Sequence, residues 1–559
     1  MKKINKIKLI LPLAALSLSV LSCSDYLDIN ESPNAGHIES VTPALVLPGA
    51  INELFMTEGS EPGGSRLSSM MTLGNVMMNS WATDVHNFGG IFGSEYTLGS
   101  VNSGFYSGIW GRIYLYAANL KLVEDYPNAD HSQDNYVAIA KVVKAFYMQY
   151  IVDLYGDAPY KEAFLRSANT SPKYDDDKEI YKALIGELEA ANALIDNNMP
   201  NKAAAATDPI FKGDMNKWKA FSNTIKLRML LRMSNVTGEM ATYRDQKLAT
   251  LAGATFIKDT KTTDLLDITD NVLNNPGYSN GNNDKMNPFI SSYRATSSGS
   301  SVQLYSNLTA SEHLANCLNG NLMNSTESYY TKFNGIVDPR RFRMFSSVTY
   351  NGVAQVKGIR QGANSGQPGA PTDNKTLSKL GTGNFAGSTA VTTVGQLITA
   401  GNARGGMVMS IAESELLQAE AALRYPAIFS GAEDHFNNAI DASRKWLGAD
   451  KVAVDAYKVA IASVPGLGLG AGTFNQKIEA IMTQKWLVLT NVNGAEMFIE
   501  YNRTGYPITP MAVTSTMPNR PYRLFYPSSE YATNSLNVPN LTTSQVFTKN
   551  AATPFWNQN

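Results

Sequence analysis

The segment YVAIAKVVKAFYMQYIVDLYGDAPY, residues 136–160, contains the clearest helical pattern of the 559-residue chain. Apolar and aromatic residues recur in it at steps of three and four, at Tyr136, Ile139, Ala140, Val143, Phe146, Tyr147, Tyr150, Ile151 and Leu154. This spacing is typical of an α-helix with one broad apolar face. We expect the helix to end at Gly156, where a left-handed cap costs little, and Pro159 to prevent it from resuming.

Helical spacing of apolar residues also occurs on both sides of this segment, at 109–123, 181–191 and 218–229. Beyond Gly253 the periodicity fades, and Asn, Ser, Gly, Thr and Pro become frequent until helical spacing returns at Met407. The tail is again irregular and rich in proline. We therefore predict a helical scaffold at 41–253 and 407–501, with loop-rich regions at 254–406 and 504–559.

The first 22 residues have the organisation of an export signal. Four lysines precede an apolar run from Leu9 to Leu21, which is too short to span a bilayer. The run is followed by Ser22 and Cys23, a small residue and a cysteine, which resembles a bacterial lipobox. We expect residues 1–22 to be removed and Cys23 to carry lipid that tethers the mature chain to a membrane. The alternative is ordinary secretion with an incidental Cys23.

The composition narrows the range of partners. The formal net charge is −1, from 47 basic and 48 acidic side chains, so nucleic acid and anionic membrane surfaces are poor partners. Only 17% of residues are charged, and neutral polar residues are plentiful. Such a surface suits hydrogen bonding to neutral hydroxylated ligands, although extracellular proteins often share this composition.

Motifs for catalysis are missing from the sequence. The five histidines form no zinc motif, no Gly-x-Ser-x-Gly elbow occurs, and the glycine-rich stretches lack the context of a phosphate-binding loop. Acidic residues could supply a glycosidase pair, but no pair stands out. His313 and Cys317 could share a helix face as a nucleophile and its base, but we favour a buried thiol for Cys317. These observations indicate neither a catalytic site nor a cofactor, and they leave metal content open.

Aromatic residues in polar, glycine-rich stretches are the best candidates for a ligand site. A ring stacks against the C–H face of a sugar while neighbouring amides bind its hydroxyls. The candidate ligand-binding residues are Trp81, Asn87, Phe88, Tyr96, Tyr278, Tyr293 and Tyr305. Tyr329 and Tyr330 lie in a later loop. The alternative for each ring is packing onto the core.

Motifs distributed along most of the chain point to one family. They are CSDYLDIN at 23–30, DLYGDAPY at 153–160, DPR at 338–340, QKW at 484–486 and RTGYP at 503–507. Together they resemble the SusD/RagB family of outer-membrane lipoproteins from Bacteroidetes, and its SusD-like branch most closely. Physically, the shared residues belong to a scaffold: we expect Trp218 and Trp486 to anchor helices, and Arg228, Arg232, Asp338 and Arg340 to form buried ion pairs.

This resemblance implies a mainly α fold in which a loop-rich region packs over four helix pairs of tetratricopeptide type, in one domain of residues 23–559. It also implies a protein of the outer membrane that faces the cell exterior, captures glycan and delivers it to a SusC-like TonB-dependent β-barrel without catalysing a reaction. Three alternatives stay open: a lid with peptide cargo, a purely structural lid, and a glycoside hydrolase.

Overall fold

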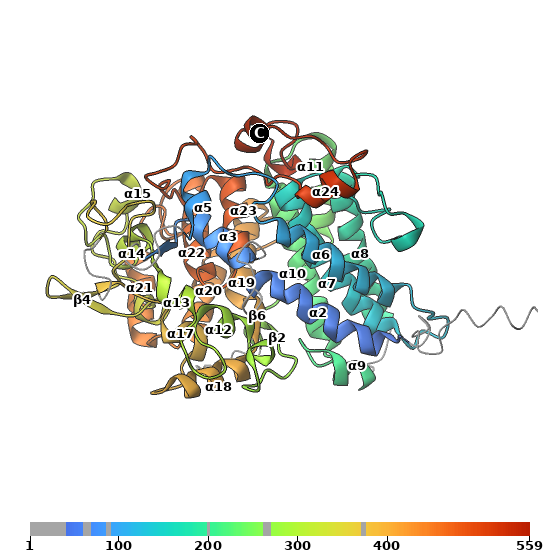
Figure 1. The fold of residues 1–559 in the computed structure, drawn as a ribbon, viewed down its shortest axis with the longest axis horizontal. Helices are drawn as coiled ribbons and strands as arrows, with labels where there is room; N and C mark the ends of the chain where they lie inside the picture. Colours follow the sequence, from blue (N-terminus) through green and yellow to red (C-terminus); the bar gives the residue numbers. More distant parts are fainter. Residues whose placement is uncertain are drawn as a thin grey trace, which may run out of the picture.

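The computed structural model describes residues 41–59, 69–84, 91–197, 202–260, 270–370 and 376–558. The expected signal peptide, Cys23, Asn87 and Phe88 lie outside the described residues. Helices make up most of the described chain, and the strands form three two-stranded sheets (Figure 1). The predicted mainly α fold is confirmed.

The N-terminal helices form a layered array. They are α2 (Pro43–Gly59), α3 (Met70–Met77), α5 (Gly93–Thr97), α6 (Ser107–Glu124), α7 (Asp134–Tyr155), α8 (Asp177–Asn197), α9 (Lys202–Thr207), α10 (Met215–Arg232) and α11 (Gly238–Ala249). Helix α6 packs between α2 and α7, and α8 packs between α7 and α10 (Figure 1). Helix α7 ends before Gly156, as predicted, but this glycine has φ 74° and ψ −130°. That conformation favours glycine although it lies outside the left-handed helical region.

The C-terminal helices complete the scaffold. They are α19 (Ile411–Arg424), α20 (Ala432–Leu447), α21 (Lys451–Ile461), α22 (Phe474–Leu489) and α23 (Gly494–Thr504). Helix α19 packs against α20, α22 and α10, and α23 packs against α3, so the two helical regions form one body. Helix α18 (Val394–Arg404) begins inside the region predicted to be loop-rich, where Thr393 and Gln396 form a capping box.

The remaining elements are short. The helices are α12 (Pro288–Tyr293), α13 (Gln303–Asn307), α14 (Glu312–Leu318), α15 (Ser328–Thr331), α16 (Arg341–Met344), α17 (Thr382–Ala386), α24 (Ser528–Thr533) and α25 (Thr543–Phe547). The strands are β1 (Trp81–Thr83), β2 (Val272–Asn274), β3 (Leu308–Ala310), β4 (Val348–Tyr350), β5 (Val353–Gln355) and β6 (Gly406–Met409). All three pairs, β1–β3, β2–β6 and β4–β5, are antiparallel. The first two join loop-rich segments to distant parts of the chain.

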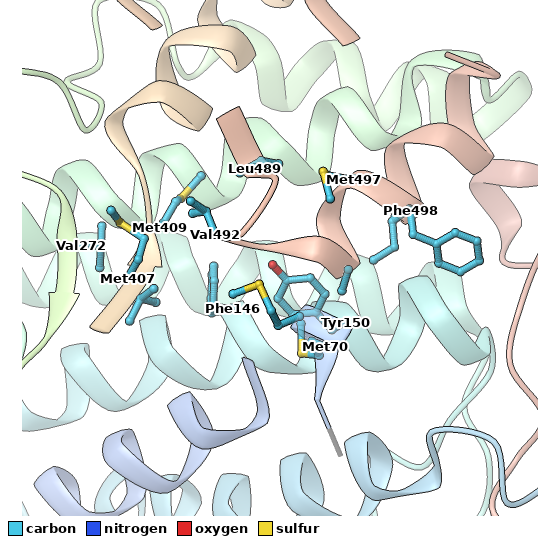
Figure 2. Close-up of a cluster of buried hydrophobic side chains, with 14 of the residues drawn as sticks. Met70, Phe146, Tyr150, Val272, Met407, Met409, Leu489, Val492, Met497 and Phe498 are labelled. Carbon is cyan, nitrogen blue, oxygen red and sulfur yellow. The ribbon is translucent and has the colours of Figure 1, made fainter. Parts of the chain in front are cut away.

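The hydrophobic core passes through both helical regions. Figure 2 shows Phe146 and Tyr150 of α7 among side chains from α3, β2, β6, α22 and α23, including Met70 and Met497. Methionine side chains fill irregular gaps well because they are unbranched and flexible. Trp218 is fully buried, as predicted, and so is Trp486 at 2% exposure.

A network of buried ion pairs centres on α10. Arg228 lies 3.2 Å from the Glu413 carboxylate of α19. Arg232 contacts Asp153 of α7 at 3.3 Å and Glu496 of α23 at 2.7 Å. Burial alone would raise the pKa of Glu496, but the neighbouring cations, Arg232 foremost, hold it below its usual range. The predicted burial of these arginines in ion pairs is confirmed.

Two further cations extend the network. Lys485 of α22 contacts Glu496 at 3.0 Å, and Arg503 of α23 contacts Glu420 of α19 at 2.7 Å. Although burial opposes ionisation of Glu420, Arg503 and a second arginine lower its pKa to about 2. A separate buried pair, Arg340–Asp338 at 2.7 Å, also confirms the sequence prediction.

We predict that Arg232→Met strongly destabilises the protein. The substitution keeps an apolar stem but leaves Asp153 and Glu496 buried without their shared cation, which costs about 3–5 kcal/mol of unfolding free energy. Chemical denaturation measures this loss. The matched control is Lys451→Met, which removes the exposed Lys451–Asp455 pair of α21 and should cost less than about 1 kcal/mol. Equal losses for both variants would contradict the importance of the network.

Candidate functional site

Trp81 and Tyr293, two of the aromatic residues singled out in the sequence, meet inside the core. Their ring centroids are 5.3 Å apart, and both side chains are fully buried. The Trp81 indole N–H donates to Asn491 Oδ1 at 2.6 Å, and the Tyr293 hydroxyl lies 2.8 Å from Ser69 Oγ. In this structure neither ring has a free face for a ligand, and their contacts stabilise the scaffold.

The other described candidates have polar or cation–π partners of their own. Tyr96 is buried, and its hydroxyl accepts the Thr83 backbone N–H at 3.0 Å. Tyr278 is half-buried and accepts a hydrogen bond from the Asn274 amide at 2.9 Å. Tyr305 is half-buried beneath the Arg294 guanidinium, 4.4 Å from the ring centroid. Tyr96 thus contacts β1, the strand that contains Trp81, and Tyr305 packs against the residue that follows Tyr293. Ligand binding by these residues stays a prediction.

Two neighbouring hollows in the loop-rich region combine aromatic, amide and charged groups. The Tyr329 hollow, of about 320 Å³, is lined by Asn79, Glu312, His313, Met323, Ser325, Glu327, Tyr329, Tyr330, Arg360, Gln361, Pro510, Met511 and Val513. The Tyr350 hollow, of about 300 Å³, is lined by Glu312, Ala315, Asn316, Asn319, Leu322, Met323, Tyr350, Asn351, Val353, Gln355, Val356, Lys357 and Gly358. Their elements α14, α15 and β4 lie together at the left edge of Figure 1, opposite α6–α8.

Two short helices build the Tyr329 hollow. Helix α14 begins at Glu312, because the Ser311 hydroxyl caps it by accepting the Leu314 N–H at 3.0 Å. Helix α15 places the Tyr329 and Tyr330 rings 4.6 Å apart. Tyr330 is buried, and its hydroxyl lies 3.0 Å from Nδ1 of the α14 histidine, whereas Tyr329 is half-buried. The buried ring thus supports the more accessible one.

An ion pair supplies hydrogen-bonding groups beside the Tyr329 ring. Arg360 Nε donates to Glu312 Oε1 at 2.7 Å, and the Arg360 side chain is 41% exposed. His313 cannot act as an acid there, because burial lowers its pKa to about 3 and so keeps it neutral. An accessible ring next to paired donors and acceptors is suited to binding a hydroxylated ligand.

The β4–β5 hairpin builds the Tyr350 hollow. Asn351 and Gly352 form its two-residue turn with φ of 50° and 77°, the backbone that Asn-Gly favours in hairpins. Asn319 of the α14 end accepts the Val356 N–H at 3.1 Å and donates to the Val356 carbonyl at 2.7 Å. Lys357 Nζ lies 4.6 Å from the Tyr350 ring centroid. The ring therefore projects from the hairpin and lies beside a cation.

Two other hollows fit a glycan less well. A groove of about 700 Å³ between α8 and α10 is lined by no aromatic residue, and its charges pair with each other, as Lys226 does with Glu189 at 2.6 Å. A pocket walled by Phe289, Phe385 and Trp446 has only about 30 Å³ of free space. The first lacks a stacking ring, and the second is too small for a sugar.

Chemistry beyond binding finds little support in the described ranges. Cys317 is buried, and burial raises the pKa of its thiol to about 12, which confirms a buried thiol and not a nucleophile. Within those ranges, no group of three or more His, Cys, Asp or Glu side chains is placed to hold a metal ion. None of the described helices is both long and apolar enough to cross a bilayer.

Only some of the residues that line these hollows could be recognised in the sequence. Tyr329 and Tyr330 stood out as loop aromatics, and Asn351-Gly352 after a strand-like stretch is a recognised hairpin signal that would have located Tyr350. The Glu312–Arg360 pair joins residues 48 positions apart. No spacing rule connects residues at that separation outside regular structure.

Comparison with known proteins identifies the family. The model of a SusD-like family, described as starch-binding and associating with the outer membrane, matches residues 37–527. The chain therefore belongs to the SusD-like family, which confirms the resemblance. The family consists of carbohydrate-binding proteins and not of enzymes, in agreement with the sequence prediction. No protein with a curated description matches the sequence.

Solved structures show the same fold. A SusD homologue from Bacteroides thetaiotaomicron is 20% identical with a TM-score of 0.63, over 89% of this chain and 93% of its own. A chitin-binding SusD homologue from Flavobacterium johnsoniae is 20% identical with a TM-score of 0.64, over 88% and 94%. A chitin-binding protein is 22% identical with a TM-score of 0.65, over 93% and 100%. At these identities the likeness concerns the fold.

We predict that Trp81→Ala destabilises the protein by about 3–5 kcal/mol, because it opens a cavity in the core and leaves the Asn491 amide without its indole partner. Thermal and chemical unfolding measure this effect. Tyr305→Ala, at a half-buried ring, should cost about 1 kcal/mol or less. A Trp81→Ala protein of unchanged stability that no longer bound glycan would instead show that Trp81 is a ligand residue.

Proposed function

We propose that this chain is a lipid-anchored receptor on the outer membrane that captures oligosaccharide or polysaccharide in the Tyr329 hollow. The observation that carries the proposal is the half-buried Tyr329 ring beside the Glu312–Arg360 pair. The ring supplies a stacking face, and the ion pair offers a donor and an acceptor to adjacent sugar hydroxyls. Family membership supports glycan as the ligand class, and two solved structures of the same fold are described as chitin-binding.

The second part of the proposal is delivery. Cys23, acylated after removal of residues 1–22, holds the protein at the outer membrane facing the cell exterior. The cargo then passes to a SusC-like TonB-dependent β-barrel that this protein covers. The description of the family as associating with the outer membrane supports this location. Co-isolation of such a barrel with the native protein after mild cross-linking would support the partnership, and repeated isolation without one would count against it.

We predict that Tyr329→Ala weakens glycan binding at least about tenfold, equivalent to about 1.4 kcal/mol, because the stacking face is lost. Tyr329→Phe keeps the ring and should bind within about twofold of wild type. Affinity electrophoresis in gels containing a panel of polysaccharides, starch and chitin derivatives included, identifies the ligand. Calorimetry with the retained glycan then gives Kd.

The matched control is Tyr116→Ala on α6, a half-buried tyrosine beside Arg112 on the scaffold. This variant should bind like wild type. Binding by wild type that is unaffected by Tyr329→Ala would place the site elsewhere. Indifference to every glycan, together with peptide that co-purifies with the protein, would favour peptide cargo.

We predict that Cys23→Ala abolishes acylation of the chain and its sorting to the outer membrane. Wild type produced in a Bacteroidetes host should incorporate radioactive palmitate and fractionate with outer membranes, because two or more acyl chains give stable anchoring. The variant should be unlabelled and absent from the outer-membrane fraction. Wild type that is itself unlabelled and soluble would disprove the anchor without bearing on the glycan site.

A further inference from the structure

The Tyr329 and Tyr350 hollows share a wall. Glu312 and Met323 line both of them. Glu312, Ala315 and Asn316 of α14 lie on one helical face and line the Tyr350 hollow, as does Asn319 directly after the helix, whereas His313 lines the Tyr329 hollow. The first turn of α14 therefore lies between two adjacent hollows, and its Glu312 lines both of them.

We infer that the two hollows are successive positions of one track for an extended glycan chain, with Tyr350 as the stacking ring of the second position. The inference rests on the proposed function, since it needs glycan in the Tyr329 hollow. It adds a second set of ligand-binding residues. It also specifies the class of ligand, which is a chain of several linked sugars bound at both positions at once.

Size supports a chain over a compact ligand. The hollows measure about 320 and 300 Å³, each at the lower limit of about 300 Å³ for small-molecule sites. Each alone encloses little of a large ligand. A linear oligosaccharide is long and narrow, so it fills two small adjoining hollows better than one.

The position of Tyr350 is fixed by contacts within the protein. Its carbonyl accepts a hydrogen bond from the Gln355 amide at 3.1 Å across the hairpin, and Lys357 Nζ lies against its ring. Ser378 fixes Lys357, since the Lys357 N–H donates to Ser378 Oγ at 2.9 Å and its carbonyl accepts the Ser378 N–H at 2.9 Å. A ring positioned before binding loses little conformational freedom when a sugar stacks on it.

Apolar side chains complete the second position. Leu322, Met323 and Val353 are 42%, 47% and 45% exposed around the Tyr350 hollow. Such side chains cover the C–H faces of sugar rings, while the Asn351 amide at the hairpin tip is exposed to bond hydroxyls. Contact at a second position of a linked ligand avoids a further loss of translational freedom, so it raises affinity for long chains.

The experiment measures Kd against chain length. Calorimetry on wild type, Tyr350→Ala and Tyr350→Phe uses chito- and malto-oligosaccharides from disaccharide to about octasaccharide, plus the equivalent series from any polysaccharide that retains wild type in gels. Wild-type affinity should rise with length. Tyr350→Ala should leave the disaccharide Kd unchanged and weaken the longest chains about tenfold, whereas Tyr350→Phe should behave like wild type.

The possible failures are distinguishable. No binding of wild type to any series would overturn the proposed function. Binding of wild type with a length dependence that Tyr350→Ala leaves unchanged would overturn the track and leave the proposed function intact. Equal weakening of disaccharide and long chains would also overturn it, because Tyr350 would then belong to the first position. Circular dichroism and thermal unfolding confirm that each variant is folded.

Discussion

The burial of two arginines on one helix constrains the whole scaffold. Arg228 and Arg232 of α10 have no contact with solvent, so the fold has to bring a carboxylate to each of them. The partners come from far along the chain: Glu413 is 185 residues from Arg228, and Glu496 is 264 residues from Arg232. Leaving a buried charge unpaired costs several kcal/mol, so these helices assemble together or not at all. The result is a rigid platform, on which loops keep a defined shape.

Side-chain amides hold many of those loops in place. Gln361, beside the Tyr329 hollow, donates to the carbonyls of Val76 and Trp81 at 2.9 and 2.7 Å, and Asn319 binds both backbone groups of Val356. Each side-chain amide makes the backbone hydrogen bonds that a neighbouring strand would make in a regular sheet. Asparagine side chains are therefore used to hydrogen-bond loops to one another as well as to bind ligand. In this way the backbone N–H and C=O groups of short irregular segments find hydrogen-bond partners, while a ring such as Tyr329 stays accessible.

The scaffold could be predicted from the sequence far better than the site. The periodicity of 136–154 and the isolated Trp218 specify buried helix faces, because helical spacing fixes which side chains point together. The polar, glycine-rich surroundings of Trp81 indicated a loop but not its depth, and the ring lies in the core. The Glu312–Arg360 pair depends on where the start of α14 meets a distant loop, which no local pattern encodes. The geometry of a site assembled from loops is determined by the tertiary structure. The sequence alone indicates only which residue types are available for it.

The burial of Cys317 has a practical consequence for spectroscopy. It is the one cysteine of the chain besides Cys23, and its high pKa leaves almost no thiolate to react with maleimides in the native state. A cysteine introduced at an exposed position such as Asn351 would therefore take a fluorescent dye without a competing thiol in a protein whose Cys23 is acylated or removed. Labelling of the native chain itself would be negligible, so the signal would come from the dye at the hairpin tip. The fluorescence of this dye could report the binding and release of cargo in real time.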